Sequence, residues 1–321
     1  MVTPAIIKEF ENIVGADNVF TDDADLMTYS YDAAVVKPVV PALVARPTSS
    51  EALGRVVALC GENGLAITVR GAGTNLSGGT VPTGREGVVI LTNGLNRILE
   101  INEADMYAVV QPGVVTAKFA AAAQAKGLFY PPDPGSQAVS TLGGNVAENA
   151  GGLRGLKYGV TKHYVMGMEI VLANGERVRF GGKTVKNVTA YDFSNLFVGS
   201  EGTLGIIVEI TCKLVPAPKF RRTMLANFKK LEDAGNAVAG IIKAHVIPAT
   251  LEIMDNKTIT TVENFAGIGL PVDAEALLLI EVDGMAEILV EQEAEAVMEV
   301  VRRNNRSEER RVGKECRTRW S

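Results

Sequence analysis

Residues 67–80, which read ITVRGAGTNLSGGT, join a short apolar stretch to a loop that contains four glycines. Glycine has no Cβ atom, so a glycine-rich backbone can adopt positive φ and can approach a ligand closely. Successive N–H groups in such a loop can form a concave anion site, and Arg70 places a positive charge at its entrance. The stretch therefore predicts a strand followed by a loop that holds a diphosphate.

The spacing of the glycines separates this loop from two common phosphate sites. A dinucleotide fingerprint needs G-x-G-x-x-G at the start of a helix, but here the third glycine comes late and residues 81–87 (VPTGREG) contain too many helix breakers. A P-loop needs a Gly-Lys-Ser or Gly-Lys-Thr sequence, and none follows this loop. On this stretch alone, an ordinary glycine-rich surface loop remains the alternative.

Composition narrows the class of protein. The 321 residues are enough for about two domains, and 47% hydrophobic with 21% charged residues is typical of a soluble globular protein. A net charge of −5 argues against a nucleic-acid partner. The amino terminus lacks the features of a signal peptide, and no apolar run approaches the length of a transmembrane segment. Together with three widely separated cysteines, these features predict a cytoplasmic protein.

Periodicity predicts the elements that precede the loop. Residues 4–14 are expected to form a helix that Thr3 caps, and residues 42–46 a buried strand. The sequence TSSE at 48–51 is a capping-box pattern that starts a second helix, after which residues 67–69 begin the next strand. The glycine loop is then expected at the carboxyl end of a strand, helix, strand unit.

Two later stretches resemble the loop in their small residues. Residues 131–136 read PPDPGS and residues 140–152 read STLGGNVAENAGG, and we expect both to be irregular and to approach a flat ligand. Residues 199–207, GSEGTLGII, form a third glycine-rich loop that leads into a strand. We expect the three loops to meet around one extended ligand. The alternative for residues 131–152 is a long loop without a function.

Together with LKYG at 156–159, these motifs resemble the FAD-binding domain of the vanillyl-alcohol oxidase and p-cresol methylhydroxylase (PCMH) type. Within that superfamily the chain is most similar, over residues 10–304, to the family of the glycolate oxidase catalytic subunit and the D-lactate and D-2-hydroxyglutarate dehydrogenases. The resemblance implies an α+β fold. It consists of a PCMH-type FAD-binding domain of two α+β subdomains over residues 1–218 and an incomplete α+β, ferredoxin-like cap domain over residues 219–304.

The resemblance also implies where FAD binds. The first loop would hold the diphosphate, the stretches at 131–136 and 140–152 would line the flavin, and the third loop would hold the adenosine half. The implied cofactor-binding residues are Arg70, Gly71, Ala72, Gly73, Thr74, Asn75, Leu76, Ser77, Gly78, Pro132, Asp133, Ser140, Thr141, Gly144, Ala147, Asn149, Glu201, Gly202, Thr203, Gly205 and Ile207. Some members attach flavin through histidine or cysteine, but His163, His245 and the cysteines lie outside the glycine loops, so we expect non-covalent FAD.

The implied activity is oxidation of a small D-2-hydroxy acid, such as glycolate or D-lactate, to the 2-oxo acid by hydride transfer to flavin. A quinone, a cytochrome or an iron–sulfur subunit would accept the electrons, and the chain would be cytoplasmic or peripheral at the inner face of the membrane. The alternatives are a non-catalytic FAD-binding subunit of a flavoprotein complex and an enzyme similar to the alkyl ether lipid synthases.

The carboxyl-terminal end departs from the resemblance. Family members continue into a histidine-rich metal and substrate motif, which is expected beyond this chain, so no catalytic residue and no metal ligand is assigned here. Residues 305–321 are rich in charge and contain the only tryptophan, and we expect them to be a non-native tail outside the cap domain. We therefore expect little turnover from this chain by itself.

Overall fold

The computed structural model describes residues 2–84, 86–189, 191–304 and 306–312, the last segment by its backbone alone. The chain divides into two compact units. The first comprises Met1–Tyr130, Ser136–Ala150 and Val160–Pro216, and the second comprises Pro131–Gly135, Gly151–Gly159 and the chain from Ala217 onward. The sequence analysis places the two short segments of the second unit in the first domain. Among the described residues, no helix is long and apolar enough to cross a lipid bilayer.

The first unit begins with a small sheet. Its strand order is β1-β2-β4-β3, with parallel pairing everywhere except between β1 and β2. The strands are β1 (Val19–Phe20), β2 (Leu43–Ala45), β3 (Ile67–Arg70) and β4 (Val88–Leu91). The helices α1 (Pro4–Val14) and α3 (Ser50–Glu62) contribute to the core on one face, whereas α2 (Asp23–Thr28) packs Leu26 on Val44 and Val89 of the other face.

The helix starts follow from their caps. The side chain of Thr3 accepts a hydrogen bond from the Ile6 amide and begins α1, as predicted. Ser49, rather than Thr48, caps α3, because its hydroxyl accepts from the Ala52 amide at 3.1 Å. Cys60 is fully buried in α3 and belongs to the core of the first unit.

A second, antiparallel sheet completes the first unit, with strand order β5-β6-β10-β8-β9. Its strands are β5 (Ile98–Asn102), β6 (Tyr107–Val110), β8 (Val165–Val171), β9 (Arg177–Gly181) and β10 (Ile206–Lys213). The remaining elements are α4 (Thr116–Gln124), α5 (Leu142–Glu148), α7 (Phe193–Phe197), the pair β7 (Leu128–Phe129) and β11 (Val215–Pro216), and the short 3-10 helices Ala16–Asn18, Thr92–Gly94 and Thr161–Tyr164.

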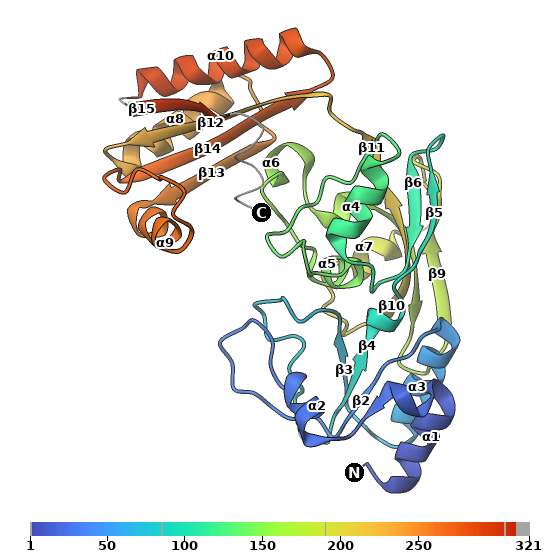
Figure 1. The fold of residues 1–321 in the computed structure, drawn as a ribbon. Helices are drawn as coiled ribbons and strands as arrows, with labels where there is room; N and C mark the ends of the chain where they lie inside the picture. The colour runs from blue at the N-terminus through green and yellow to red at the C-terminus, as the bar shows by residue number, and fades with distance from the viewer. Residues whose placement is uncertain (1, 85, 190, 305, 313–321) are drawn as a thin grey trace. The chain divides into compact units, whose positions relative to one another are not determined.

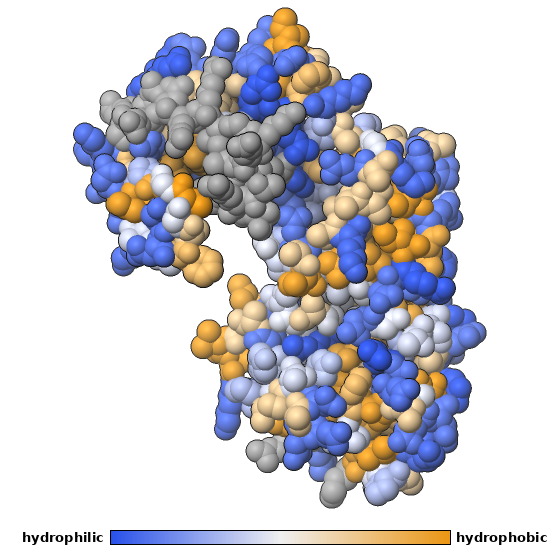
Figure 2. Space-filling view, viewed as in Figure 1, coloured by the Kyte–Doolittle hydropathy of each residue, from blue (hydrophilic) through white to orange (hydrophobic). Residues whose placement is uncertain are grey.

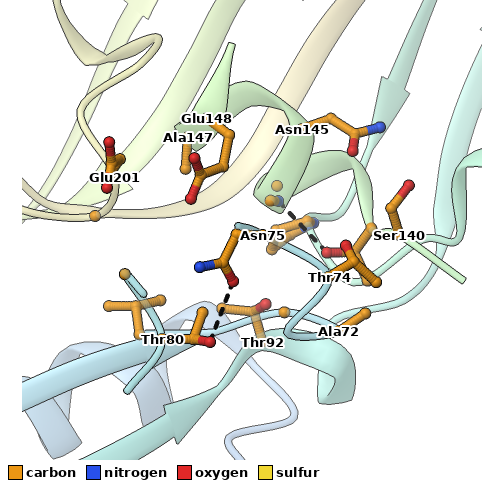
Figure 3. Close-up of a pocket in the computed structure, with 18 of the residues that line it drawn as sticks. Ala72, Thr74, Asn75, Thr80, Thr92, Ser140, Asn145, Ala147, Glu148 and Glu201 are labelled. Atoms are coloured by element: carbon orange, nitrogen blue, oxygen red, sulfur yellow. Dashed lines mark hydrogen bonds between the residues drawn. The ribbon is translucent and has the colours of Figure 1, made fainter. Parts of the chain in front are cut away.

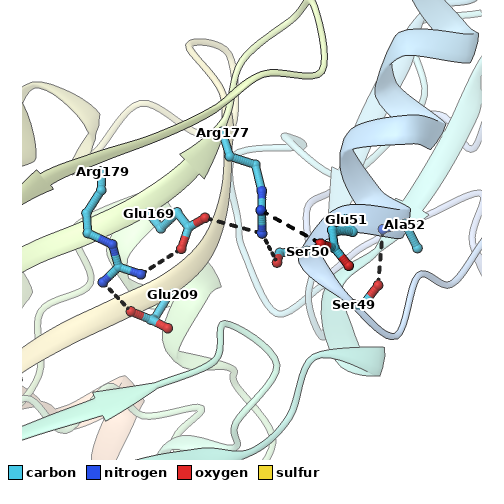
Figure 4. A network of polar contacts seen from close by, with 8 residues as sticks. All are labelled: Ser49, Ser50, Glu51, Ala52, Glu169, Arg177, Arg179 and Glu209. Carbon is cyan, nitrogen blue, oxygen red and sulfur yellow. Dashed lines mark hydrogen bonds and ion pairs between the residues drawn. The ribbon is translucent and has the colours of Figure 1, made fainter.

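Charged side chains join the two sheets of the first unit (Figure 4). Arg177 on β9 donates a hydrogen bond to the Ser50 hydroxyl at the start of α3 at 2.8 Å. Arg179 reaches Glu169 on β8 at 2.7 Å and Glu209 on β10 at 2.6 Å. This network connects β8, β9 and β10 to the helix that covers the small sheet.

Helix α5 corrects the sequence analysis, which expects residues 140–152 to be irregular. The helix forms despite two adjacent glycines because Thr141 caps it and Leu142 and Val146 are buried. Gly143 packs so closely on Pro112 that a Cβ atom would overlap it. The glycines therefore serve close packing of a short helix rather than an extended loop.

The second unit is a four-stranded antiparallel sheet in the order β13-β14-β12-β15. Its strands are β12 (Phe220–Phe228), β13 (Thr250–Asp255), β14 (Ala276–Gly284) and β15 (Arg306–Val312). Helices α8 (Leu231–Lys243) and α10 (Glu287–Arg303) cover one face, and α9 (Asn256–Ala266) packs on the other; the single turn α6 (Gly155–Tyr158) also belongs to this unit. Hydrophilic residues predominate on the outer side of α10 (Figure 2).

The tail differs in part from expectation. The sequence analysis expects residues 305–321 to lie outside the cap domain, but the backbone of Arg306–Val312 pairs with β12 as strand β15. Residue 305 and residues 313–321 lie outside the described residues. Whether the tail is native stays a prediction.

Candidate cofactor site

A cavity of about 280 Å³ lies in the first unit, between the loop after β3, helix α5 and the loop before β10 (Figure 3). Two glycine-rich loops and helix α5 therefore surround one space. The predicted residues that line it are Gly71, Ala72, Gly73, Thr74, Asn75, Leu76, Ser140, Thr141, Gly144, Ala147, Glu201, Gly202, Gly205 and Ile207. Backbone and small side chains dominate this lining, which suits a long ligand that needs close approach.

In the first loop, two glycines adopt positive φ. Gly73 has φ +69° and Gly78 has φ +80°, whereas Gly71 and Gly79 do not enter the left-handed region. Gly71 serves a different purpose, because a Cβ atom there would overlap the hydroxyl of Thr141. The first loop can therefore approach the start of α5 this closely only because residue 71 has no side chain.

Arg70 lies beneath the first loop rather than at its entrance. Its side chain is buried, and Nη1 donates to the Tyr31 carbonyl at 2.6 Å and to the Thr80 hydroxyl at 3.4 Å. The guanidinium also lies 5.7 Å from the centre of the Tyr29 ring. Burial lowers the pKa of Arg70, and the nearby Asp32 carboxylate opposes that shift. Arg70 therefore supports the loop and does not line the cavity.

Asp32 organises the other side of the loop. Its carboxylate accepts from the Asn75 side chain at 2.8 Å, from the Thr80 hydroxyl at 3.1 Å and from the Ala34 amide at 2.8 Å. Burial raises the pKa of Asp32, but these hydrogen bonds outweigh it and hold the pKa below its usual value. Asn75 also accepts from Thr80 at 3.2 Å (Figure 3). Hydrogen bonds among the Asp32, Asn75 and Thr80 side chains therefore fix the loop.

The second wall is held by buried hydrogen bonds. The Thr141 hydroxyl accepts from the Gly144 amide at 3.4 Å and so caps α5. Asn145 donates to the Thr116 hydroxyl at 2.7 Å, and Ser140 and Thr116 join their hydroxyls at 3.0 Å. These contacts fix α5 and the residue before its cap against the start of α4.

The third loop attaches to the end of α5. The amides of Gly199 and Glu201 donate to the carbonyls of Val146 at 3.0 Å and Ala147 at 2.9 Å. Glu201 has φ +53°, an uncommon conformation for a residue with a side chain. The strained turn points to a functional constraint at this position.

Seven predicted residues do not line the cavity: Arg70, Ser77, Gly78, Pro132, Asp133, Asn149 and Thr203. Pro132 and Asp133 belong to the second unit, where the Asp133 carboxylate lies 3.3 Å from Arg154 Nε. Asn149 adopts a left-handed conformation at the end of α5 and accepts from the Lys162 amide at 3.0 Å. Asn149 therefore forms the turn that ends α5.

Part of the lining lies outside the residues that the sequence predicts. The missed residues are Val69, Gly79, Thr80, Thr92, Pro112, Ser136, Gly143, Asn145, Glu148, Ala150 and Ile206. Glu148 is the charged member of this set, and it points into the cavity from α5 (Figure 3). Its signal was present in the sequence, as a carboxylate next to Asn149 among small residues, but only a helix shows which way it points.

Two family models match the chain. An FAD binding domain matches residues 41–181, and a C-terminal domain of FAD linked oxidases matches residues 217–317. The chain therefore carries an FAD binding domain followed by a domain similar to the C-terminal domain of FAD linked oxidases. The lining fits this cofactor, because the first loop offers backbone amides in a groove that stays open where its glycines carry no side chain. FAD is the cofactor of this chain.

Named relatives agree with this family. The chain is 46% identical over 305 residues to glycolate oxidase subunit GlcD of Bacillus subtilis (strain 168), covering 95% of this chain and 64% of the relative. It is 39% identical to GlcD of Escherichia coli (strain K12), covering 93% and 59%, and 38% identical to a D-lactate dehydrogenase of Anaerostipes hadrus, covering 94% and 64%. The chain thus spans 59–64% of the length of these relatives.

Solved structures share the fold. An alkyldihydroxyacetonephosphate synthase superimposes with a TM-score of 0.83 at 21% identity, covering 100% of this chain and 63% of that one. A p-cresol methylhydroxylase with substrate bound superimposes with a TM-score of 0.74 at 20% identity, covering 99% and 69%. These likenesses confirm the PCMH-type α+β fold that the sequence predicts.

Proposed function

We propose that this chain holds FAD non-covalently and belongs to an enzyme that oxidises a D-2-hydroxy acid, such as glycolate or D-lactate, to the 2-oxo acid. The observation that carries the proposal is the meeting of two glycine-rich loops and helix α5 around one cavity in a chain that an FAD binding domain model matches. The substrate class rests on relatives named glycolate oxidase subunit, D-lactate dehydrogenase and D-2-hydroxyglutarate dehydrogenase.

The residues of the chain would bind and orient the cofactor. Amides of residues 71–76 would hold the diphosphate, the start of α5 at Thr141 and Gly144 would form the wall toward the flavin, and the loop at Glu201 would hold the adenosine half. When bound, FAD supplies the acceptor for the hydride of the substrate α-carbon. The buried bonds beneath the loop and behind α5 pre-organise these walls before the cofactor arrives.

The described residues that line the cavity include neither histidine nor cysteine, and this supports non-covalent attachment. His163 lies outside the lining and uses Nδ1 to accept from the Val160 amide at 3.1 Å. Burial raises the pKa of the Cys60 and Cys212 thiols to about 12, so neither is a ready nucleophile. Flavin fluorescence that stays on the protein band of a denaturing gel would refute the proposal of non-covalent binding.

Electrons would leave the flavin for a quinone, a cytochrome or an iron–sulfur subunit, and the enzyme would work in the cytoplasm or peripherally at the inner face of the membrane. The test uses the chain loaded with FAD under anaerobic conditions. Addition of glycolate, D-lactate or D-2-hydroxyglutarate is expected to bleach the flavin absorbance slowly, in a single reduction, for one of the three, because little turnover is expected from this chain by itself. Retention of FAD without bleaching by any of them would instead favour a non-catalytic FAD-binding subunit.

A further inference from the structure

A carboxylate stands inside the cavity that is proposed to take a diphosphate. Glu148 points into the space from α5 (Figure 3), and the Ser77 hydroxyl of the first loop donates to its Oε1 at 3.1 Å. A Cβ atom on Gly79 would lie 3.6 Å from Oε1 of Glu148 and 3.2 Å from Oε2 of Glu201. Two carboxylates therefore converge at one edge of the first loop.

The charges around Glu148 are mostly negative. Glu201 approaches from the loop before β10, and Asp32 lies beyond Asn75 on the segment after α2. Arg70, at the end of β3, is engaged beneath the loop by Tyr31 and Thr80. Within the described part of the chain, no lysine or arginine forms an ion pair with Glu148 or Glu201.

The ionised form of Glu148 is therefore disfavoured even before a ligand binds. Burial raises its pKa, Glu201 raises it further, and Asp32 adds to the rise, against a lowering by the Ser77 hydrogen bond. A diphosphate held by the loop brings further negative charge close to the partly buried Glu148. The ionised carboxylate and the ligand would repel each other, whereas a neutral carboxyl could donate its O–H to an oxygen of the ligand.

We propose that Glu148 takes up a proton from solvent when FAD binds, so that it makes cofactor affinity depend on pH. This inference rests on the proposed function, because it requires FAD in the cavity. The proton goes to the Glu148 carboxylate, and no other bond forms or breaks. Affinity then falls as pH rises between the pKa of Glu148 in the free protein and its higher pKa in the complex, by at most about tenfold per pH unit.

The test is a titration of the apo chain with FAD, followed by quenching of flavin fluorescence, across the range from about pH 5.5 to about pH 8.5. Calorimetry in two buffers of different ionisation enthalpy counts the protons taken up by the wild type without any variant. Glu148→Gln, which mimics the protonated form, is expected to bind about tenfold more tightly than the wild type at the alkaline end and to lose the pH dependence. Circular dichroism confirms that the variant is folded.

Glu176→Gln is the matched control, because Glu176 is exposed in the turn between β8 and β9 and does not line the cavity. It is expected to keep the pH dependence of the wild type. FAD binding without proton uptake, or weaker binding by Glu148→Gln at every pH, would overturn the role of Glu148 while leaving the FAD site intact. Failure of both wild type and variant to bind FAD at any pH would instead overturn the proposed function, and this inference with it.

Discussion

Gly73 shows at the scale of one residue how the loop depends on an absent side chain. Its φ of +69° already favours glycine, and a Cβ atom would overlap the guanidinium of Arg70. Arg70 is held by Tyr31 and Thr80 and is buried, so it cannot move aside easily. The position of the Arg70 side chain therefore requires that residue 73 is a glycine.

Gly73→Ala is expected to lower the free energy of unfolding by about 2 kcal/mol and to weaken FAD binding at least about tenfold. Gly64→Ala is the control, because Gly64 has φ +63° but nothing within 4 Å of the added Cβ atom. Urea unfolding and FAD titration of both variants check the prediction. Equal losses in the two variants would show that the contact with Arg70 is unimportant and that only backbone strain matters.

Asp32 gives a prediction about pH at the same scale. Its pKa is lower in the folded protein than in the unfolded chain, so its ionised form adds stability above the unfolded pKa, and this is lost as pH falls through the folded pKa. Below about pH 4 the wild type is expected to lose stability more steeply than Asp32→Asn. Parallel stability curves of the two proteins in urea unfolding would contradict this.

At the scale of elements, α5 is a helix that the sequence does not predict, in contrast to the helices with a strong apolar periodicity. Helix α1, which has a regular apolar face, spans the residues that the sequence predicts, because its periodicity is strong. Residues 142–148 carry two glycines and little periodicity, and tertiary packing on Pro112 and Thr116 decides their helix instead. Because the sequence does not predict this helix, it also does not predict that the Glu148 side chain points into the cavity.

Thr141 makes the cap of α5 testable. Thr141→Ala removes the hydroxyl that accepts from the Gly144 amide and is expected to cost about 1 kcal/mol of folding free energy. Thr141→Ser keeps the oxygen and is expected to retain most of the stability. Urea unfolding of both variants distinguishes a cap from simple loss of packing, because a packing role would make serine nearly as harmful as alanine.

At the scale of the whole molecule, the chain crosses between its two units more often than the sequence suggests. Gly151–Gly159 follows directly after the cavity wall, yet it belongs with the second unit. There Lys157 reaches the nearly buried Asp283 carboxylate on β14 at 2.6 Å, and the Tyr158 hydroxyl donates to the same carboxylate at 2.8 Å. Such a contact between residues far apart in sequence has no local signal, so sequence reasoning could not find it.

This contact is expected to be asymmetric. Lys157→Met leaves a buried carboxylate without its cation and is expected to cost about 3 kcal/mol, whereas Asp283→Asn leaves a lysine that can reach water and should cost less. Urea unfolding of the two variants measures the difference. A larger loss in Asp283→Asn would mean that the bond from Tyr158, rather than the ion pair, holds the segment.

The central claim is that two glycine-rich loops and helix α5 of the first unit enclose one FAD molecule. The most direct measurement is the flavin content of the purified chain after incubation with FAD and gel filtration, with the flavin released by denaturation and identified chromatographically. One FAD for each chain, all of it released without reduction or proteolysis, is the predicted result. A chain that is folded by circular dichroism yet retains no FAD at saturating concentration would contradict the account.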